Sequence, residues 1–214
     1  MPKTVIFDFD GTIADSIPSN AVILKVFNQI AGENNFKNIT MEEIENLRNV
    51  GLYESIKLLK IPVLKLPFLA RRVRKVLKVD ETVVEPIKNM PQVLNSLKKQ
   101  GVSLGILTSN KKQTVEKFLK KHELEVFDFI HSQTNLFGKD KSLKSLLKKH
   151  KLDKNMVIYV GDEIRDIQAT KKTGISMIAV TWGYNNKKGL EKFDPEFLAE
   201  RPMQLKTILE KFFA

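Results

Sequence analysis

The stretch Val5-Ile6-Phe7-Asp8-Phe9-Asp10-Gly11-Thr12 carries the strongest structural signal in the chain. Four of its residues, Val5 to Phe7 and then Phe9, are apolar, and they are followed by Gly11, a residue typical of turns. A short apolar run that ends in a turn residue predicts a buried strand. Two carboxylates, those of Asp8 and Asp10, therefore lie where this strand ends.

Asp8 and Asp10 are two residues apart, so on an extended backbone their side chains would leave the same face of the strand. Carboxylates that close repel each other unless a proton or a cation lies between them. Mg²⁺ is a suitable cation, since it prefers oxygen ligands and usually retains waters and a substrate phosphate. The alternative is that both residues only begin a loop, but the full pattern D-F-D-G-T-I-A-D-S after an apolar run favours a metal site.

The composition limits the possible classes of protein. At 214 residues with 42% apolar content, the chain is long enough for one large domain, or for one domain with an insert. It contains no cysteine, which excludes disulfide frameworks, zinc sites with Cys ligands and Cys nucleophiles. The N-terminus lacks the features of a secretion signal, and no apolar run approaches the length of a membrane span. We therefore expect a cytoplasmic location and no membrane partner.

The net charge of +11, from 36 Lys and Arg against 25 Asp and Glu, raises the possibility of a nucleic-acid partner. However, the lysines are spread as pairs over several predicted helices, without a zinc motif or an aromatic-rich strand for stacking bases. We interpret them as solvated helix faces and expect no nucleic-acid partner. A protein that did bind a phosphate backbone would lose affinity steeply with added salt.

Residues 16–82 have a helical pattern throughout and are predicted to form a separate cap domain. The first helix is expected over Ile17–Ile30 with Gly32 as its stop, and Thr40-Met41-Glu42-Glu43 forms a capping box for the second. A third helix is expected over Leu52–Lys60, and a fourth follows Pro67. The predicted cap interrupts a second unit, formed by residues 1–15 and 83–214.

From Pro86 onward, strands and helices alternate. Strands are expected at 102–107, 128–131, 156–160 and 175–180, and helices at 89–100, 111–122, after Gly138-Lys139-Asp140, and from about 164 to 172. Together with the first strand, this makes five strands joined by helices. The predicted fold class is therefore α/β, a doubly wound, Rossmann-like parallel sheet with an inserted all-helical cap.

Polar residues follow three of the predicted strands. In open α/β sheets the ligand site lies beyond the carboxyl ends of the strands, so we expect these residues to converge. They are Asp8 and Asp10, then Thr108-Ser109-Asn110, and then Asp162-Glu163 with Asp166. Asn110 is expected to cap the next helix, whose free N–H groups would attract an anion. Lys139 can add a positive charge. Carboxylates for a metal beside donors for a phosphate are what phosphoryl transfer needs.

These motifs together resemble those of the haloacid dehalogenase superfamily of phosphatases, and in particular its phosphoglycolate-phosphatase-like members. The resemblance covers nearly the entire chain: D-F-D-G-T is the first motif, L-T-S-N the second, the Lys before a helix the third, and G-D-E-I-R-D the fourth. The first and fourth motifs are specific in combination. The helical insert fits the family's cap, of the C1 type, and the segment Thr181–Asn185 resembles the end of the fifth strand in this group.

The resemblance implies a role for each matching residue. Asp8 would be the nucleophile that forms an aspartyl-phosphate, and Asp10 the general acid and base. The phosphoryl group would be bound by Thr108 and Lys139, with Ser109 and Asn110 beside them. Mg²⁺ would be held by Asp8, the backbone carbonyl of Asp10, and Asp162, with Asp166 and Glu163 in support.

Several alternatives remain open at this point. Lys141 competes with Lys139, although Lys139 has the more family-like spacing of 23 residues before Asp162 (162 − 139). Thr108 to Asn110 could be only a helix cap, and Asp166 could only tether its own helix. The cap is cationic and would suit an anionic leaving group, although its cations could also be solvated; they are Arg48, Lys57, Arg71, Arg72 and Arg74. Arg48, near Gly51 at a helix end, could face the core.

The predicted function is Mg²⁺-dependent hydrolysis of a small, phosphoglycolate-like phosphate monoester by a monomer or weak homodimer. A phosphomutase resembling β-phosphoglucomutase would have the same architecture and differ only in the acceptor of the phosphoryl group. A non-catalytic, anion-binding regulatory protein is a third possibility, which the intact set of Asp8, Asp10, Lys139 and Asp162 disfavours.

Overall fold

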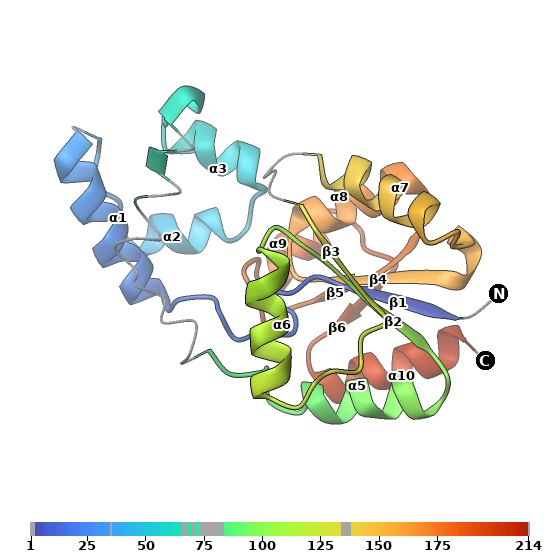
Figure 1. Cartoon of the computed structure of the whole chain (residues 1–214). Helices are drawn as coiled ribbons and strands as arrows, with labels where there is room; N and C mark the ends of the chain where they lie inside the picture. Colours follow the sequence, from blue (N-terminus) through green and yellow to red (C-terminus); the bar gives the residue numbers. More distant parts are fainter. Residues whose placement is uncertain are drawn as a thin grey trace.

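A parallel β-sheet forms the centre of the protein (Figure 1). The computed structural model describes residues 3–34, 36–65, 68–69, 72, 84–133 and 138–213. Within these residues the sheet has six strands in the order β3-β2-β1-β4-β5-β6, and every neighbouring pair is parallel. The strands are β1 (Thr4–Phe7), β2 (Ser103–Thr108), β3 (Phe129–Ser132), β4 (Val157–Gly161), β5 (Ser176–Val180) and β6 (Phe197–Ala199). The α/β doubly wound fold predicted from the sequence is confirmed.

Strand β1 lies in the middle of the sheet, with Phe7 paired in register with Ile106 of β2 and Val160 of β4. All four of its residues are buried, because helices cover both faces of the sheet. The strand ends at Phe7, so the expectation that Phe9 belongs to it is wrong. Phe9 instead begins a turn, in which its carbonyl accepts hydrogen bonds from the backbone N–H groups of residues 12 to 14, and Gly11 there has a φ of 69°.

The two faces of the sheet pack against different helices (Figure 1). Val5 and Phe7 point into a core shared with α5, α6 and α10, whereas Ile6 points into one shared with α7 and α8. This alternation is the two-residue period of a strand. The helices are α5 (Met90–Lys99), α6 (Lys112–Lys121), α7 (Lys139–Lys149), α8 (Ile164–Thr173), α9 (Lys187–Glu191) and α10 (Pro202–Phe212), with a short 3₁₀ turn, η2, at Lys154–Met156.

The secondary-structure elements that the structure describes between β1 and α5 are all helices, joined by loops, and they lie to one side of the sheet (Figure 1). Its elements are α1 (Asn20–Asn34), α2 (Met41–Leu47), α3 (Leu52–Leu58) and η1 (Val63–Lys65). The capping box at Thr40 is confirmed, since Thr40 Oγ1 accepts from Glu43 N at 3.2 Å and Glu43 Oε2 accepts from Thr40 N at 2.8 Å. The boundary expected at 82/83 and most of the helix expected after Pro67 lie outside the described residues.

Some predicted elements need correction. The first cap helix begins at Asn20, not at Ile17, and it continues through Gly32. The helix continues because Ile30 and Ala31, just before this glycine, are buried and keep its last turn packed. The sequence also missed strand β6, whose three residues are too few to show a period of two.

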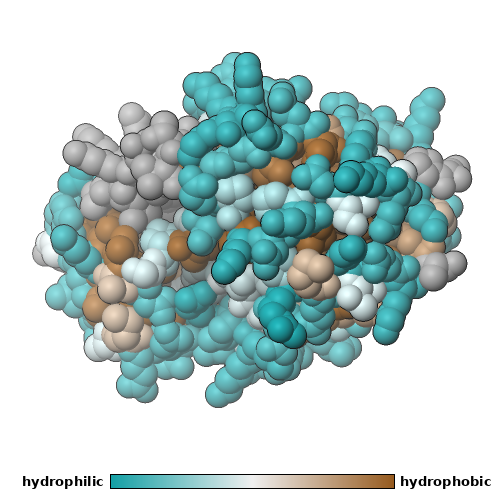
Figure 2. Space-filling model, turned by 90° about the horizontal axis from the view of Figure 1, so that it is seen from below, coloured by the Kyte–Doolittle hydropathy of each residue, from teal (hydrophilic) through white to brown (hydrophobic). Residues whose placement is uncertain are grey.

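The surface is largely polar. The face at the bottom of Figure 1 carries mainly hydrophilic residues, with hydrophobic ones in small separate groups (Figure 2). The lysine pairs are exposed as expected, except that Lys98 is half-buried and forms an ion pair with Asp128. Among the described residues, no helix is both long enough and apolar enough to cross a bilayer.

Candidate active site

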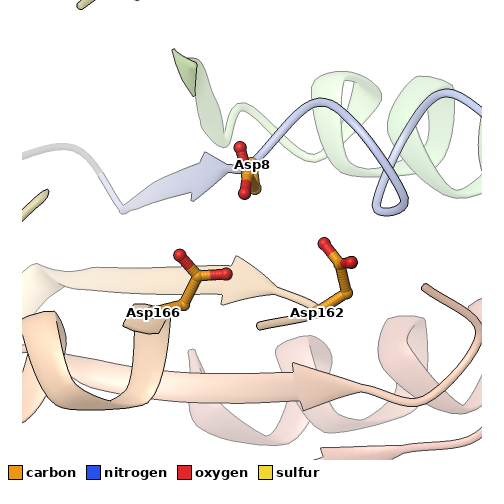
Figure 3. A group of neighbouring side chains, drawn as sticks. All are labelled: Asp8, Asp162 and Asp166. Carbon is orange, nitrogen blue, oxygen red and sulfur yellow. The ribbon is translucent and has the colours of Figure 1, made fainter. Parts of the chain in front are cut away.

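Three carboxylates meet at the carboxyl end of the sheet. Asp8 directly follows β1, Asp162 directly follows β4, and Asp166 lies in the first turn of α8. One oxygen from each lies within 4.8 Å of the others, and all three side chains are buried. Figure 3 shows the three carboxyl groups pointing into the same space. The convergence expected from the parallel topology is therefore present for these residues.

Asp162 is held by residues from two other segments. Its Oδ1 accepts a hydrogen bond from Thr12 Oγ1 at 2.7 Å, and its Oδ2 accepts from the backbone N–H of Tyr184, also at 2.7 Å. Thr12 is fully buried, and its carbonyl accepts from Trp182 Nε1 at 3.2 Å. The orientation of Asp162 is thus fixed by the loop after β1 and the loop after β5. No pattern in the sequence identified Thr12 as a partner of Asp162.

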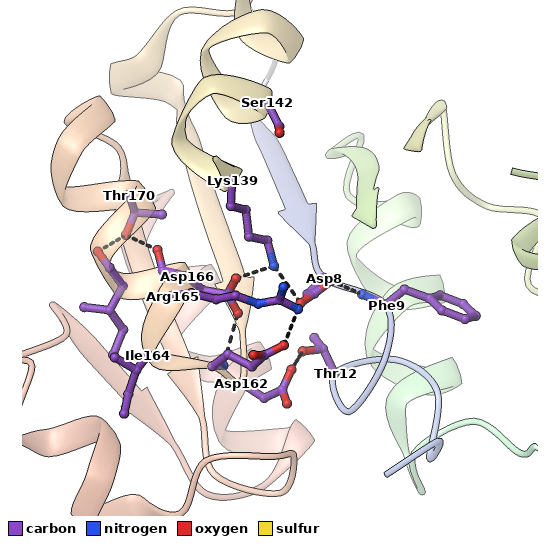
Figure 4. A network of polar contacts seen from close by, with 12 residues as sticks. Asp8, Phe9, Thr12, Lys139, Ser142, Asp162, Ile164, Arg165, Asp166 and Thr170 are labelled. Carbon is purple, nitrogen blue, oxygen red and sulfur yellow. Dashed lines mark hydrogen bonds and ion pairs between the residues drawn. The ribbon is translucent and has the colours of Figure 1, made fainter. Parts of the chain in front are cut away.

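Lys139 supplies the positive charge of the cluster (Figure 4). Its Nζ donates to Asp8 Oδ2 at 2.7 Å and also forms an ion pair with Asp166. Lys139 is the first residue of α7 and follows Gly138, whose φ of 92° suits glycine. Lys141, the competing candidate, is exposed on the same helix. The structure therefore places Lys139, and not Lys141, beside Asp8.

When ionised, the three carboxylates carry two more negative charges than Lys139 alone can balance. Burial raises the pKa of Asp162 well above its usual value, and the charges of Glu163, Asp8 and Asp166 raise it further. Burial also raises the pKa of Asp166, to about 6, although Lys139 opposes this change. Burial lowers the pKa of Lys139, but the carboxylates of Asp166 and Asp8 more than offset this and raise it. Three buried oxygen donors with excess negative charge fit a divalent cation such as Mg²⁺.

The carboxylate of Asp10 belongs to a separate network. Its Oδ1 accepts from Ser16 Oγ and its Oδ2 from Asn110 Nδ2, both at 2.7 Å. Burial raises the pKa of Asp10, and the neighbouring charge of Asp8 adds to the effect. A raised pKa increases the protonated fraction near neutral pH, which suits a group that donates a proton. The structure thus keeps this side chain out of the three-carboxylate cluster.

Residues at the carboxyl end of β2 line a small pocket together with Asp8. Thr108 is buried, Ser109 is half-buried, and both face this pocket with Asp8 and Lys139. The expectation that Asn110 caps the next helix is wrong, because α6 is preceded by Lys111 and has no side-chain cap. The side-chain amide of Asn110 instead donates a hydrogen bond to the carboxylate of Asp10. The pocket thus has hydroxyl groups, an ammonium and a carboxylate around a small space.

Of the two acidic residues expected to support the metal site, Asp166 belongs to the three-carboxylate cluster and Glu163 does not. Asp166 does tether its own helix, since its Oδ2 accepts from Glu163 N at 3.1 Å, but it also belongs to the cluster. The carboxylate of Glu163 instead forms an ion pair with Arg165. Both roles of Asp166 are compatible because its two oxygens point in different directions.

Arg48 faces the core, as the sequence suggested. Its Nε donates to the carbonyl of Tyr184 at 2.7 Å and its Nη2 to that of Gly183 at 2.6 Å. Asn185 Nδ2 returns a hydrogen bond to the Arg48 carbonyl at 2.9 Å. The junction between α2 and α3 is therefore attached to the same loop that holds Asp162.

We expect Gly183→Ala to disturb the site through Asp162. A Cβ at Gly183 would lie 2.2 Å from Asp162 Oδ2 and 2.3 Å from its Cβ, so the aspartate must move. Overpacking of this kind typically lowers the free energy of unfolding by about 1–3 kcal/mol. Denaturant unfolding and a Mg²⁺ titration should show lower stability and weaker metal binding. Gly32→Ala is the control, because a Cβ there meets nothing within 4 Å and alanine favours a helix by about 1 kcal/mol. Equal stability of the two variants would contradict this account.

Comparison with known proteins agrees with the geometry. The family described as haloacid dehalogenase-like hydrolase matches residues 5–180. The chain is 29% identical over 204 residues to a phosphoglycolate phosphatase of Synechococcus elongatus, with 95% of each chain covered. It is 26% identical over 218 residues to the pyrophosphatase PpaX of Bacillus mycoides, covering 98% of this chain and 97% of the relative.

Solved structures show the same fold. A haloacid dehalogenase-like family hydrolase from Streptococcus pneumoniae superposes with a TM-score of 0.75 at 22% identity, covering 97% of this chain and 98% of that one. A hydrolase from Pseudomonas syringae has a TM-score of 0.74 at 19% identity and covers 98% of both chains. The family resemblance seen in the sequence motifs is confirmed. With most of its length matched by the family, the chain belongs to the haloacid dehalogenase-like hydrolases.

Proposed function

We propose that the protein is a phosphatase that hydrolyses a small phosphate monoester through an aspartyl-phosphate on Asp8. The observation that carries this proposal is the position of the Asp8 carboxylate. It contacts the ammonium of Lys139, belongs to the acidic cluster, and lines the small pocket that contains Thr108 and Ser109. A nucleophile, a cation and phosphate-binding donors are thus gathered around one small space.

In the first step, an Asp8 carboxylate oxygen attacks phosphorus and the bond from phosphorus to the ester oxygen breaks. The leaving alkoxide takes the proton of Asp10. In the second step, Asp10 removes a proton from a water molecule, which attacks the same phosphorus and releases inorganic phosphate. Asp8 is then again a carboxylate, and the proton of Asp10 has been restored.

Lys139 and Thr108 would bind the phosphoryl oxygens, with Ser109 lining the same pocket. Lys139 is well suited to this task because its pKa is raised, so it stays charged. Donors fixed before the reaction stabilise the transition state without reorganising. The hydrogen bonds from Ser16 and Asn110 would hold Asp10 in one orientation for its two proton transfers.

A Mg²⁺ ion would be held by Asp8, Asp162 and Asp166, with the backbone carbonyl of Asp10 as a further ligand implied by the family resemblance. When bound, the ion would neutralise the carboxylates and the substrate phosphate, which lets one anion approach another. The rigid support of Asp162 by Thr12 and Tyr184 favours this assignment. Two named relatives act on phosphoglycolate and pyrophosphate, so we propose a small, phosphoglycolate-like substrate.

We expect the purified protein to hydrolyse p-nitrophenyl phosphate in the presence of Mg²⁺ and to lose this activity on chelation. The loss follows because, without the dication, the substrate phosphate meets several buried carboxylates of the same charge. Added Mg²⁺ should restore the rate, which shows that the protein stayed folded. Activity that survives chelation would rule out the metal-dependent mechanism. With a phosphate ester that carries a second hydroxyl group as the substrate, release of inorganic phosphate instead of a phosphorylated isomer would distinguish a hydrolase from a mutase.

A further inference from the structure

A cavity of about 330 Å³ lies between the cap and the core, next to the acidic cluster. On the cap side it is lined by the first turn of α3, including Tyr53 and Glu54. On the core side it is lined by Lys139, Arg165 and Lys172. The pocket that contains Asp8 and Thr108 is much smaller, about 20 Å³. The rest of any substrate must therefore extend beyond it.

Two residues, Lys139 and Arg165, line both the small pocket and the cavity. They form the wall that the two spaces share. Lys139 is already engaged with Asp8 and Asp166, in the position where a phosphoryl group would bind. Arg165 is the second cation at this junction, and no role in the proposed reaction requires it.

Arg165 is placed and charged to bind an anion. It lies in the first turn of α8, and Figure 4 shows its side chain extending toward Asp8 alongside Lys139. Its ion pair with Glu163 fixes one side of the guanidinium. A guanidinium presents five N–H donors in a planar fork, which matches a carboxylate or phosphate in two-point contacts. Because Arg165 lines both spaces, its guanidinium is within reach of an anionic group bound there.

Among the described cap residues, none of those that line the cavity is a cation. Arg48 is bound to core carbonyls, and Arg72 forms an ion pair with Glu33. Lys57 is exposed and does not line the cavity, whereas Arg71 and Arg74 lie outside the described residues. The sequence analysis suggested that cations of the cap meet the leaving group, but the cations that line the cavity belong to the core.

On the basis of the proposed function, we propose that Arg165 is a specificity-determining residue that binds a second anionic group of the substrate, carried by the leaving group in this cavity. A carboxylate and a phosphate share the chemistry that the guanidinium recognises. The two named relatives fit this class, since glycolate carries a carboxylate and pyrophosphate leaves a phosphate. A volume of about 330 Å³ suits a compact group of either kind.

The test compares kcat/KM for three substrates. 2-Phosphoglycolate and pyrophosphate have an anionic leaving group, whereas ethyl phosphate has the same two-carbon chain as phosphoglycolate without the carboxylate. Arg165→Gln should lower the ratio of kcat/KM for phosphoglycolate to that for ethyl phosphate by roughly 10- to 100-fold, as expected for a lost charged hydrogen bond. Arg165→Lys should recover part of this ratio. The kcat/KM for pyrophosphate shows whether Arg165 also contributes to the hydrolysis of a substrate whose leaving group is a phosphate.

Two further variants separate binding from structure. Lys171→Gln removes an exposed cation of the same helix that does not line the cavity, so its ratio should stay that of the wild type. Glu163→Gln combined with Arg165→Gln avoids leaving a carboxylate without its partner, and it should show the same selective loss as Arg165→Gln. If Arg165→Gln lowered kcat/KM equally for all three substrates, or did not lower it for any, the proposal for Arg165 would be overturned. If the wild type releases phosphate from none of the esters, the proposed function itself fails.

Discussion

Asp8→Asn is expected to abolish phosphate release, lowering kcat by roughly four orders of magnitude or more, as for other nucleophile replacements. An amide in place of the carboxylate lacks the negative oxygen that would attack phosphorus. The fold should survive, because the change removes one of three buried carboxylates that repel each other. Lys139 would still be paired with Asp166. The thermal midpoint should therefore equal or exceed that of the wild type while the activity is lost.

Asp15→Asn is the matched control, since Asp15 lies on the same segment but is exposed. That variant should keep the wild-type rate. A second measurement follows the proposed intermediate directly: rapid acid quenching and intact-mass analysis should find one added phosphoryl group on the wild type and on Asp15→Asn, but not on Asp8→Asn. Turnover by Asp8→Asn, or a phosphoryl group that remains on that variant, would eliminate Asp8 as the nucleophile.

The sequence predicted the centre of the fold well because that information is local. A fully apolar run such as Val5–Phe7 can only be buried, and the acidic residues after it must lie at the end of the strand. The parallel order of the strands then places Asp8 and Asp162 at the same edge, although they are far apart in the chain. Strand ends were predicted to within one or two residues for the same reason.

Side-chain partners could not be predicted in this way, because they depend on how distant segments meet. Arg48 binds the carbonyl of a residue 136 positions away, and nothing in either segment's own pattern identifies the other. The local sequence favoured Asn110 as a helix cap, but its side-chain amide instead donates a hydrogen bond to the distant Asp10 at 2.7 Å. The position of Arg165 between two pockets depends on the start of α3, the start of α7 and α8 together.

Lys139→Met tests whether the buried ammonium both stabilises the site and binds the phosphoryl group. Lys139 is only 14% exposed and balances Asp8 and Asp166. Removal of one partner from a buried ion pair typically costs about 3–5 kcal/mol, because the remaining charge is left without compensation. We expect a loss of this size in the free energy of unfolding without Mg²⁺. We also expect kcat to fall by roughly 10²- to 10³-fold, as for the loss of one donor to a transition-state oxygen.

The response to Mg²⁺ makes this prediction specific. Without the ammonium, the cluster of Asp8, Asp162 and Asp166 has a larger excess of negative charge, so a dication should bind it more tightly. A ligand that binds only the folded state stabilises it more as its affinity rises. Mg²⁺ should therefore raise the thermal midpoint of Lys139→Met more than that of the wild type, while the low kcat persists. Lys141→Met, which removes an exposed lysine from the same helix, should behave like the wild type in both measurements. If Mg²⁺ stabilised Lys139→Met no more than the wild type, the three carboxylates would not be the metal site, because removal of their only close ammonium among the described residues must strengthen any cation bound there.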